Sequence, residues 1–240
     1  MARKGDYGID APTFPLVFGL LGIFFVGLSI WLWTSRKVVP VGPGLMAAFA
    51  LGNAGSFLYT TRRGKFEVWQ RILAGLALRG TERVLDLGCG RGAVLVAVAA
   101  RLTSGRATGI DRWRTRDQSG NARDVALRNA ALEGAADRVT IETGDLCSLP
   151  FPDASFDVVV SSLAIHNIPS ADGRATAVRE AWRVLAPGGR LAIADIRVTS
   201  DYAIALRVLG AANVTRRNLG WRFWYGNPMA STSLVTATKP

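Results

Sequence analysis

A glycine-rich turn directly after a short apolar run constrains the fold of this chain more than any other segment. Residues 84–92 read VLDLGCGRG, with glycines at the alternate positions 88, 90 and 92. Glycine adopts backbone conformations that other residues avoid and places no side chain between the backbone and a ligand. The run before the turn is typical of a buried strand, and the apolar residues 93–102 are typical of a helix. This pattern predicts a ligand site at the end of the first strand of an α/β sheet.

Strand and helix patterns continue to alternate through the rest of the chain. Strands that alternate with helices are joined by crossover connections and form a mostly parallel sheet. The expected fold class is therefore a Rossmann-like α/β fold with a doubly wound, mostly parallel, seven-stranded sheet. The expected strands are 83–87, 106–111, 138–142, 156–162, 190–195, 213–222 and 231–240, with helices at 93–102, 122–134, 173–186 and 202–211. The sequence Pro-Gly-Gly at 187–189 is expected to stop the helix before it.

A long uncharged segment precedes this domain. Residues 14–33 read FPLVFGLLGIFFVGLSIWLW, and Arg36 and Lys37 follow directly. A helix of twenty residues spans about 30 Å, which is the thickness of the hydrocarbon core of a bilayer. A signal peptide has a shorter apolar core. We therefore expect a transmembrane helix at 14–34 after an N-terminal tail at 1–13; a buried helix of a soluble protein is the other interpretation.

The next segment, 38–61, is also uncharged but contains Pro40 and Pro43. Proline and glycine near 40–44 predict a turn, after which 45–61 would form a second, shorter span. With two spans, more basic residues lie on the side of the domain 62–240 than at the tip, which favours a cytoplasmic domain. With one span, the amino terminus would lie outside, and 38–61 would rest on the membrane surface or against the domain.

Charge and cysteine content restrict the partners. The formal net charge is +11, and 25 of the 29 Lys and Arg residues lie in 62–240. The excess is spread out, without a run of five basic residues, so nucleic acid is not favoured as a partner. An anionic membrane surface or an acidic ligand remains compatible with this charge. Two cysteines, Cys89 and Cys147, form no disulfide framework, which fits a cytoplasmic domain.

Five segments in order resemble the motifs of class I S-adenosylmethionine-dependent methyltransferases. They are VLDLGCGRG (84–92), GID (109–111), GDLCSLPF (144–151), FDVVVSSLAIHNI (156–168) and EAWRVLAPGGRLAIAD (180–195). The resemblance runs from about 65 to 240, with an N-terminal membrane segment added. It implies S-adenosylmethionine as the cofactor. That molecule has no pyrophosphate, so the glycine spacing of dinucleotide folds is not required.

The resemblance also implies roles for individual residues. Asp86 would help hold the ammonium end of the cofactor, or would only brace the loop, and Asp111 would accept hydrogen bonds from the ribose hydroxyls. Arg112 would lie beside the adenine, and Ser161 near the methionine moiety. The cofactor-binding residues expected in this way are Asp86, Gly88, Cys89, Gly90, Asp111, Arg112, Asp145, Leu146 and Ser161. Cys89 is most simply a small residue between glycines, and no metal site is expected.

Candidate residues for the reaction follow the fourth strand and the last helix. His166 is the only histidine, and its ordinary pKa lies near neutrality, so it is a candidate general base. It could instead form part of the active-site wall or have no role. Trp224 and Tyr225 lie in the connection between the last two strands and would form an aromatic wall for an apolar substrate. The same aromatics could equally belong to a core-packed strand face.

The acceptor implied by these features is a small, apolar or lipid-like molecule. A membrane-anchored enzyme meets membrane-dissolved molecules at a high local concentration. The turn after the fourth strand reads SSLA rather than Asn/Asp-Pro-Pro-aromatic, which argues against methylation of nucleobase amino groups. The alternatives are a methyltransferase of protein or RNA, and a non-catalytic binding module with this fold.

Overall fold

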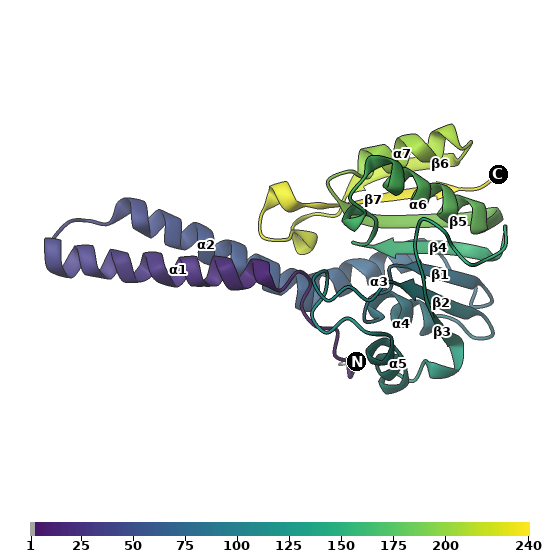
Figure 1. Cartoon of the computed structure of the whole chain (residues 1–240), viewed down its shortest axis with the longest axis horizontal. Helices are drawn as coiled ribbons and strands as arrows, with labels where there is room; N and C mark the ends of the chain where they lie inside the picture. Colours follow the sequence, from purple (N-terminus) through teal and green to yellow (C-terminus); the bar gives the residue numbers. More distant parts are fainter. Residues whose placement is uncertain (1–2) are drawn as a thin grey trace.

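The computed structural model describes residues 3–240 and contains one seven-stranded mixed sheet (Figure 1). The strand order is β3-β2-β1-β4-β5-β7-β6, and β7 alone runs antiparallel to its neighbours. The strands are β1 Arg83–Leu87, β2 Arg106–Asp111, β3 Val139–Thr143, β4 Phe156–Ser162, β5 Leu185–Ile196, β6 Ala212–Asn218 and β7 Thr232–Thr238. This arrangement confirms the expected α/β class with a seven-stranded, mostly parallel sheet, and it adds that the last strand runs antiparallel.

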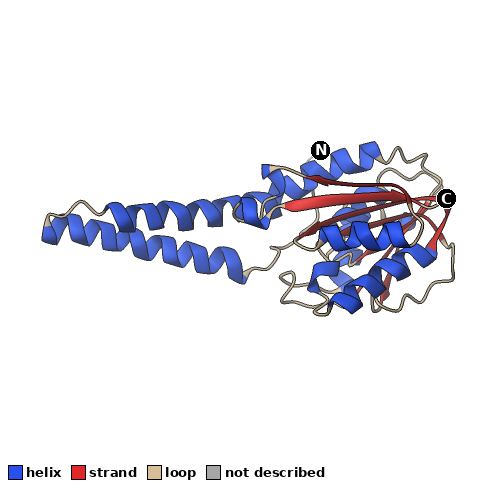
Figure 2. Ribbon diagram, turned by 90° about the horizontal axis from the view of Figure 1, so that it is seen from above, coloured by secondary structure: helices blue, strands red, loops and turns tan. Residues whose placement is uncertain are grey.

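Helices cover both faces of the sheet (Figure 2). They are α3 Lys65–Gly75, α4 Ala93–Ala99, α5 Arg123–Leu132, α6 Ala171–Val184 and α7 Thr199–Val208. Val84 and Val158 enter the core beneath α3 and α4, whereas Leu85 and Val159 enter the core beneath α6 and α7. Because successive strand residues point to opposite faces, an uninterrupted apolar strand fills both cores at once.

The expected helix stop at 187–189 is wrong. Helix α6 ends at Val184, and β5 begins at Leu185 and runs through the Pro-Gly-Gly sequence. Gly188 has a φ of +73°, and the pairing of β4 with β5 shifts register beside it. Backbone hydrogen bonds with Lys239 hold both Gly188 and Gly189. The glycines therefore make an irregular strand start, which a partner 50 residues away stabilises.

Two helices form a hairpin that projects from the domain as a long arm (Figures 1 and 2). Helix α1 covers Thr13–Trp31, and α2 covers Val41–Tyr59. Helix α2 begins four residues before the expected 45 and continues through 60–64 into α3. Pro40 caps this helix and Pro43 lies in its first turn, where proline is tolerated because no intrahelical donor is needed there. The expected boundary at 61/62 therefore lies within a continuous helix.

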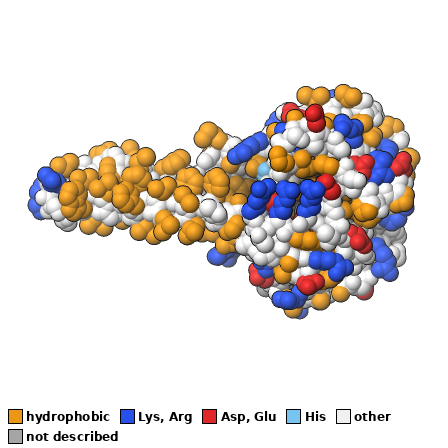
Figure 3. Space-filling model, viewed as in Figure 1, with side chains coloured by type: hydrophobic (Ala, Val, Ile, Leu, Met, Phe, Trp, Pro, Cys, Tyr) orange, Lys and Arg blue, Asp and Glu red, His pale blue; other side chains and the backbone are white. Residues whose placement is uncertain are grey.

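The hairpin surface is apolar along its length (Figure 3). Nineteen residues of α1 span about 28 Å, close to the thickness of a bilayer core. Both helices are long and apolar enough to cross a membrane. Arg36 and Lys37 lie at the tip, and Arg62 and Arg63 lie at the opposite end, next to the domain.

The described part of the expected N-terminal tail at 1–13 packs on the domain. The Asp6 carboxylate lies 2.6 Å from the guanidinium of Arg91, the arginine inside the glycine turn. Asn129 of α5 accepts the Asp6 amide hydrogen, and Glu133 accepts those of Lys4 and Gly5. The chain therefore leaves the domain at α1 and returns to it at the end of α2, as an arrangement with two membrane spans requires.

Candidate active site

A cavity of about 590 Å³ lies beyond the carboxyl ends of β1, β2, β4 and β5. Open α/β sheets bind their ligands at this edge, where the connections change direction. One part of the wall consists of the glycine turn and the segments after β2 and β3. The rest comes from the N-terminal segment, the foot of the hairpin and the β6–β7 connection. The cavity therefore joins the domain to the hairpin.

The glycine turn is held in a left-handed conformation by the neighbouring strand. The φ angles of Gly88, Gly90 and Gly92 are +69°, +52° and +84°. The amides of Gly88 and Cys89 donate to the Ile110 carbonyl at 2.8 and 3.1 Å. Cys89 is buried against Gly109, and burial raises the pKa of its thiol, which keeps it protonated. Cys89 is thus a packing residue of the turn, although it also borders the cavity.

Asp111 anchors the far side of this turn. Its Oδ2 accepts the Gly90 amide hydrogen at 2.9 Å, and its Oδ1 accepts that of Trp113 at 2.6 Å. Asn121 donates to Oδ1 at 3.2 Å and also borders the cavity, a contact that the sequence reasoning missed. A carboxylate oxygen accepts more than one hydrogen bond, so Asp111 keeps capacity for ligand hydroxyls.

Three further residues expected to bind the cofactor, Arg112, Asp145 and Leu146, meet at the cavity wall. Arg112 and Asp145 form an ion pair at 2.6 Å, and the amide of Cys147 donates to Asp145 Oδ1 at 3.0 Å. Leu146, which is 8% exposed, adds an apolar surface beside them. The ends of β2 and β3 thus bring together polar groups and an apolar surface. Such a site could bind the polar edge of an aromatic base and pack against its ring.

Asp86 is the observation that most favours a cationic ligand. It is fully buried, borders the cavity, and neither of its carboxylate oxygens has a hydrogen-bond partner among residues 3–240. Burial, together with the Asp111 carboxylate, raises the pKa of Asp86 to about 8, and the nearby Leu95 amide only partly opposes this shift. A buried carboxylate without a partner is costly unless a ligand supplies one. The ammonium end of S-adenosylmethionine fits this requirement.

This raised pKa predicts a pH dependence of cofactor binding. Below about pH 8 free Asp86 holds a proton, and a bound ammonium group favours the ionised form, so binding releases that proton. We expect the affinity for S-adenosylhomocysteine to rise up to tenfold per pH unit from pH 6 toward 7.5. Calorimetry in buffers of different ionisation enthalpy counts the released protons. Asp86→Asn should flatten the profile; an unchanged slope in this variant would assign it to another group.

One expected cofactor residue does not face the cavity. Ser161 is fully buried, and its hydroxyl donates to the Leu87 carbonyl at 2.9 Å between neighbouring strands. The next residue, Ser162, borders the cavity and accepts a hydrogen bond from Trp69 Nε1 at 2.9 Å. Successive strand residues point to opposite sides of the sheet. The residue of β4 that faces the cavity is therefore Ser162, one position after the expected Ser161.

His166 borders the cavity and is paired with a carboxylate. Its Nδ1 lies 2.6 Å from Asp195 Oδ1, and its amide donates to Asp195 Oδ2 at 3.0 Å. Asp195 is fully buried at the end of β5 and also accepts the Tyr202 hydroxyl hydrogen at 3.1 Å. Burial raises the pKa of Tyr202, so its hydroxyl remains a donor. Sequence reasoning missed Asp195, although its place at the end of a parallel strand is a usable signal.

Two aromatic residues of the β6–β7 connection were expected in the cavity wall, and one of them lies there. Tyr225 is buried in the cavity wall, and its ring packs edge-on against Phe57 of α2, with centroids 4.9 Å apart. Trp224 lies outside the cavity wall, and its carbonyl accepts the hydroxyl hydrogen of Thr60 at 2.5 Å. The connection forms short 3₁₀ turns, so its aromatic side chains do not alternate as they would in a strand.

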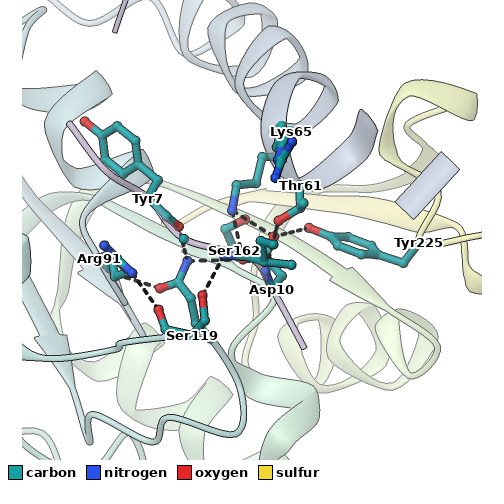
Figure 4. A network of polar contacts seen from close by, with 12 residues as sticks. Tyr7, Asp10, Thr61, Lys65, Arg91, Ser119, Ser162 and Tyr225 are labelled. Atoms are coloured by element: carbon teal, nitrogen blue, oxygen red, sulfur yellow. Dashed lines mark hydrogen bonds and ion pairs between the residues drawn. The ribbon is translucent and has the colours of Figure 1, made fainter. Parts of the chain in front are cut away.

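A polar cluster joins the hairpin to the cofactor side of the cavity (Figure 4). The Asp10 carboxylate lies 2.8 Å from Lys65 Nζ and accepts the hydroxyl hydrogens of Thr61 and Tyr225, both at 2.8 Å. Gln118 donates to Asp10 Oδ1 at 3.1 Å, and its own Oε1 accepts the Arg91 amide hydrogen at 2.9 Å. No sequence pattern pointed to Asp10, because its partners lie far from it along the chain.

The α/β fold and the position of the cavity are accompanied by similarity to known methyltransferases. Residues 85–193 match the family model described as "Methyltransferase domain". A solved S-adenosylmethionine-dependent methyltransferase from Aquifex aeolicus has the same fold, with a TM-score of 0.56 and 19% identity. The superposition covers 74% of this chain and 94% of that one.

Two curated relatives each match about half of the chain. The 27-O-demethylrifamycin SV methyltransferase of Amycolatopsis mediterranei is 38% identical over 125 residues, covering 52% of this chain and 42% of that protein. The demethylmenaquinone methyltransferase of Symbiobacterium thermophilum is 33% identical over 129 residues, covering 53% and 48%. The chain thus spans less than half the length of these relatives. Both relatives are methyltransferases, like the proteins of the matching family model.

Proposed function

We propose that this protein is a membrane-anchored methyltransferase that transfers the methyl group of S-adenosylmethionine to a small, apolar, membrane-associated acceptor. One observation carries the proposal: a single cavity extends from the glycine turn and Asp111 to the foot of the apolar hairpin. A cofactor bound at the first end and an acceptor bound at the second would share one enclosed space.

The cofactor half consists of residues that fit its parts. Asp86 would lie near the ammonium group, Asp111 would accept the ribose hydroxyl hydrogens, and Asp145 with Leu146 would surround the adenine. The bound cofactor supplies a methyl group on a positively charged sulfur, which is already reactive. The task left to the protein is therefore mainly to position the acceptor in line with the methyl–sulfur bond.

The acceptor half is apolar and comes from the hairpin. Phe14 opens α1 and stacks on Phe57 of α2, with ring centroids 6.0 Å apart. Tyr225 and Ala230 continue this wall on the domain side. If α1 and α2 lie in a bilayer, their feet stand at its surface and an apolar molecule reaches the cavity without crossing water. The hairpin would then serve both as an anchor and as part of the acceptor site.

The orientation follows from the basic residues. Arg62 and Arg63 lie at the foot of the hairpin, next to Arg3, while Arg36 and Lys37 lie at its tip. The greater positive charge at the foot supports a cytoplasmic position of the domain. Lys and Arg side chains also gather where the arm meets the domain (Figure 3), which suits an anionic membrane surface.

His166 is the proposed general base for acceptors that must lose a proton. If Nδ1–H donates to the Asp195 carboxylate, the neutral imidazole presents Nε2 as a proton acceptor. Nε2 has no hydrogen-bond partner among residues 3–240, and the ring borders the cavity. The Asp195–Tyr202 contact fixes the carboxylate and thereby the ring orientation.

We expect His166→Ala to lower kcat about 100-fold, because general base catalysis contributes roughly that much or more. Asp195→Asn should lower kcat in the same direction while leaving the affinity for S-adenosylhomocysteine within threefold of wild type. Steady-state kinetics with labelled S-adenosylmethionine, together with calorimetry, separates the two effects. If His166 only forms part of the cavity wall, His166→Ala would raise KM and leave kcat unchanged.

The proposed activity is tested with detergent-purified full-length protein. Labelled S-adenosylmethionine is incubated with the protein and a membrane extract, and the product is divided into organic-soluble and macromolecular fractions. We expect label in the organic-soluble fraction, at a level that depends on the protein. Label in protein or RNA would replace the proposed acceptor class, and binding of S-adenosylhomocysteine without transfer to any fraction would favour a binding module.

A further inference from the structure

One basic residue at the acceptor side of the cavity has no role in the proposed cofactor binding or general base catalysis. Arg197 follows β5 two residues after Asp195 and borders the cavity. Its side chain has no ion-pair or hydrogen-bond partner among residues 3–240. Asp195 does not neutralise it, because that buried carboxylate is occupied by His166 and Tyr202.

The backbone holds Arg197 in a conformation that a long side chain rarely adopts. Its φ is +62°, and its carbonyl accepts the Thr199 amide hydrogen at 2.9 Å at the start of α7. Glycine or asparagine would suit this position better. Strained residues of this kind persist where the surrounding structure fixes them, often at ligand sites. The strain here places an exposed guanidinium, unpaired among the described residues, at the rim of the cavity.

The position of Arg197 separates it from the cofactor half. Strand β5 lies three strand spacings, about 14 Å, from β2, whose end carries Asp111. Arg112 and Arg116 belong to the β2 side and are paired with Asp145 and Asp117. The unpaired Arg114 also follows β2 and lies with the cofactor half. Arg197 therefore lies on the β4–β5 side of the cavity, as His166 does, and away from the end of β2.

The surroundings of Arg197 combine one cation with an apolar wall. Ile196 precedes it in the cavity lining, and Phe14, Phe57 and Tyr225 line the hairpin side. An apolar wall, here partly buried, binds an alkyl or isoprenoid chain, and a guanidinium binds phosphate or carboxylate in a bidentate manner. From these contacts, and resting on the proposed function, we infer that the acceptor is an anionic amphiphile, with its phosphate or carboxylate on Arg197 and its apolar chain at the foot of the hairpin.

The test uses full-length protein in phosphatidylcholine nanodiscs. The probes are labelled dodecyl phosphate, dodecanol as the uncharged chain, and inorganic phosphate as the head group alone. Empty nanodiscs correct for partition into the lipid. The variants are Arg197→Asn, which removes the charge and suits the backbone conformation, and Arg197→Lys, which keeps the charge. Arg207→Asn, on the exposed side of α7 outside the cavity, is the matched control.

We expect wild type to bind dodecyl phosphate at least tenfold more tightly than dodecanol or inorganic phosphate. Arg197→Asn should lose at least tenfold in affinity, Arg197→Lys less, and Arg207→Asn almost nothing. Thermal stability of Arg197→Asn should equal or exceed that of wild type, because the backbone strain is relieved. Equal affinity of wild type and Arg197→Asn, or an equal loss in Arg207→Asn, would overturn the inference.

Two further arms identify the source of the anion and the site. Phosphatidylglycerol in the nanodisc should not displace dodecyl phosphate; full displacement would mean that Arg197 holds a bilayer head group, not an acceptor. The affinity for S-adenosylhomocysteine should be unchanged in Arg197→Asn, and a tenfold loss would assign Arg197 to the cofactor. Failure of wild type to bind S-adenosylhomocysteine would instead refute the proposed function, so the two failures are distinct.

Discussion

Replacing Asp111 with alanine is expected to weaken S-adenosylhomocysteine binding several hundredfold. The carboxylate would accept hydrogen bonds from both ribose hydroxyls, and each bond to a charged group is worth about 1.5–3 kcal/mol. The substitution also removes the acceptor for the amides of Gly90 and Trp113, so the turn that faces the cofactor loses its support. Calorimetry with detergent-purified protein measures the change directly.

The control for this experiment is Asp137→Ala. That carboxylate is 74% exposed, pairs only with the neighbouring Arg138 and lies outside the cavity, so binding should stay within twofold of wild type. Asp111→Asn keeps part of the hydrogen bonding without the charge. Its affinity for S-adenosylhomocysteine should therefore lie between those of Asp111→Ala and Asp137→Ala. NADH should not bind any of these proteins. If Asp111→Ala is folded and binds S-adenosylhomocysteine within threefold of wild type, the assigned cofactor orientation is wrong.

The second large effect concerns the hairpin. Leu20 and Phe24 lie near the middle of α1, one turn apart, and are 59% and 61% exposed. An arginine at the centre of a membrane helix costs about 2.5–3.5 kcal/mol. The double variant Leu20→Arg/Phe24→Arg should therefore lose most of its membrane association, whereas wild type should remain with membranes after a carbonate wash. Sedimentation followed by immunoblotting measures both fractions.

The matched substitution for the hairpin is Val208→Arg on α7. Val208 is 82% exposed on the domain, so the change also replaces an exposed apolar residue with arginine. This variant should stay with the membrane fraction. Wild-type protein found in the soluble fraction would contradict the membrane anchor, and equal loss from the membrane in both variants would assign the effect to misfolding.

Part of the fold could be read from local pattern. The strands at 83–87, 106–111 and 156–162 were predicted with their observed bounds, because each is a short apolar run bounded by turn residues. The ligand edge of the sheet could also be predicted from the sequence. Asp111 ends β2 and Asp145 lies two residues after β3, and parallel strands end at the same edge of the sheet. The uncharged stretch 14–33 likewise indicated a membrane-length helix without tertiary information.

What the sequence alone determined is the α/β class of the domain, the glycine turn and acidic strand ends that border the cavity, and the presence of an apolar arm, since these depend on residues that are close in the chain. Only the tertiary structure showed that Ser161 turns away while Ser162 faces the cavity, and that the Pro-Gly-Gly sequence lies within β5. It also brought Asp10, Lys65 and Tyr225 into one cluster and placed Asp195 beside His166. These contacts join segments separated by 29 to 215 residues, and packing between elements, rather than local preference, decides them.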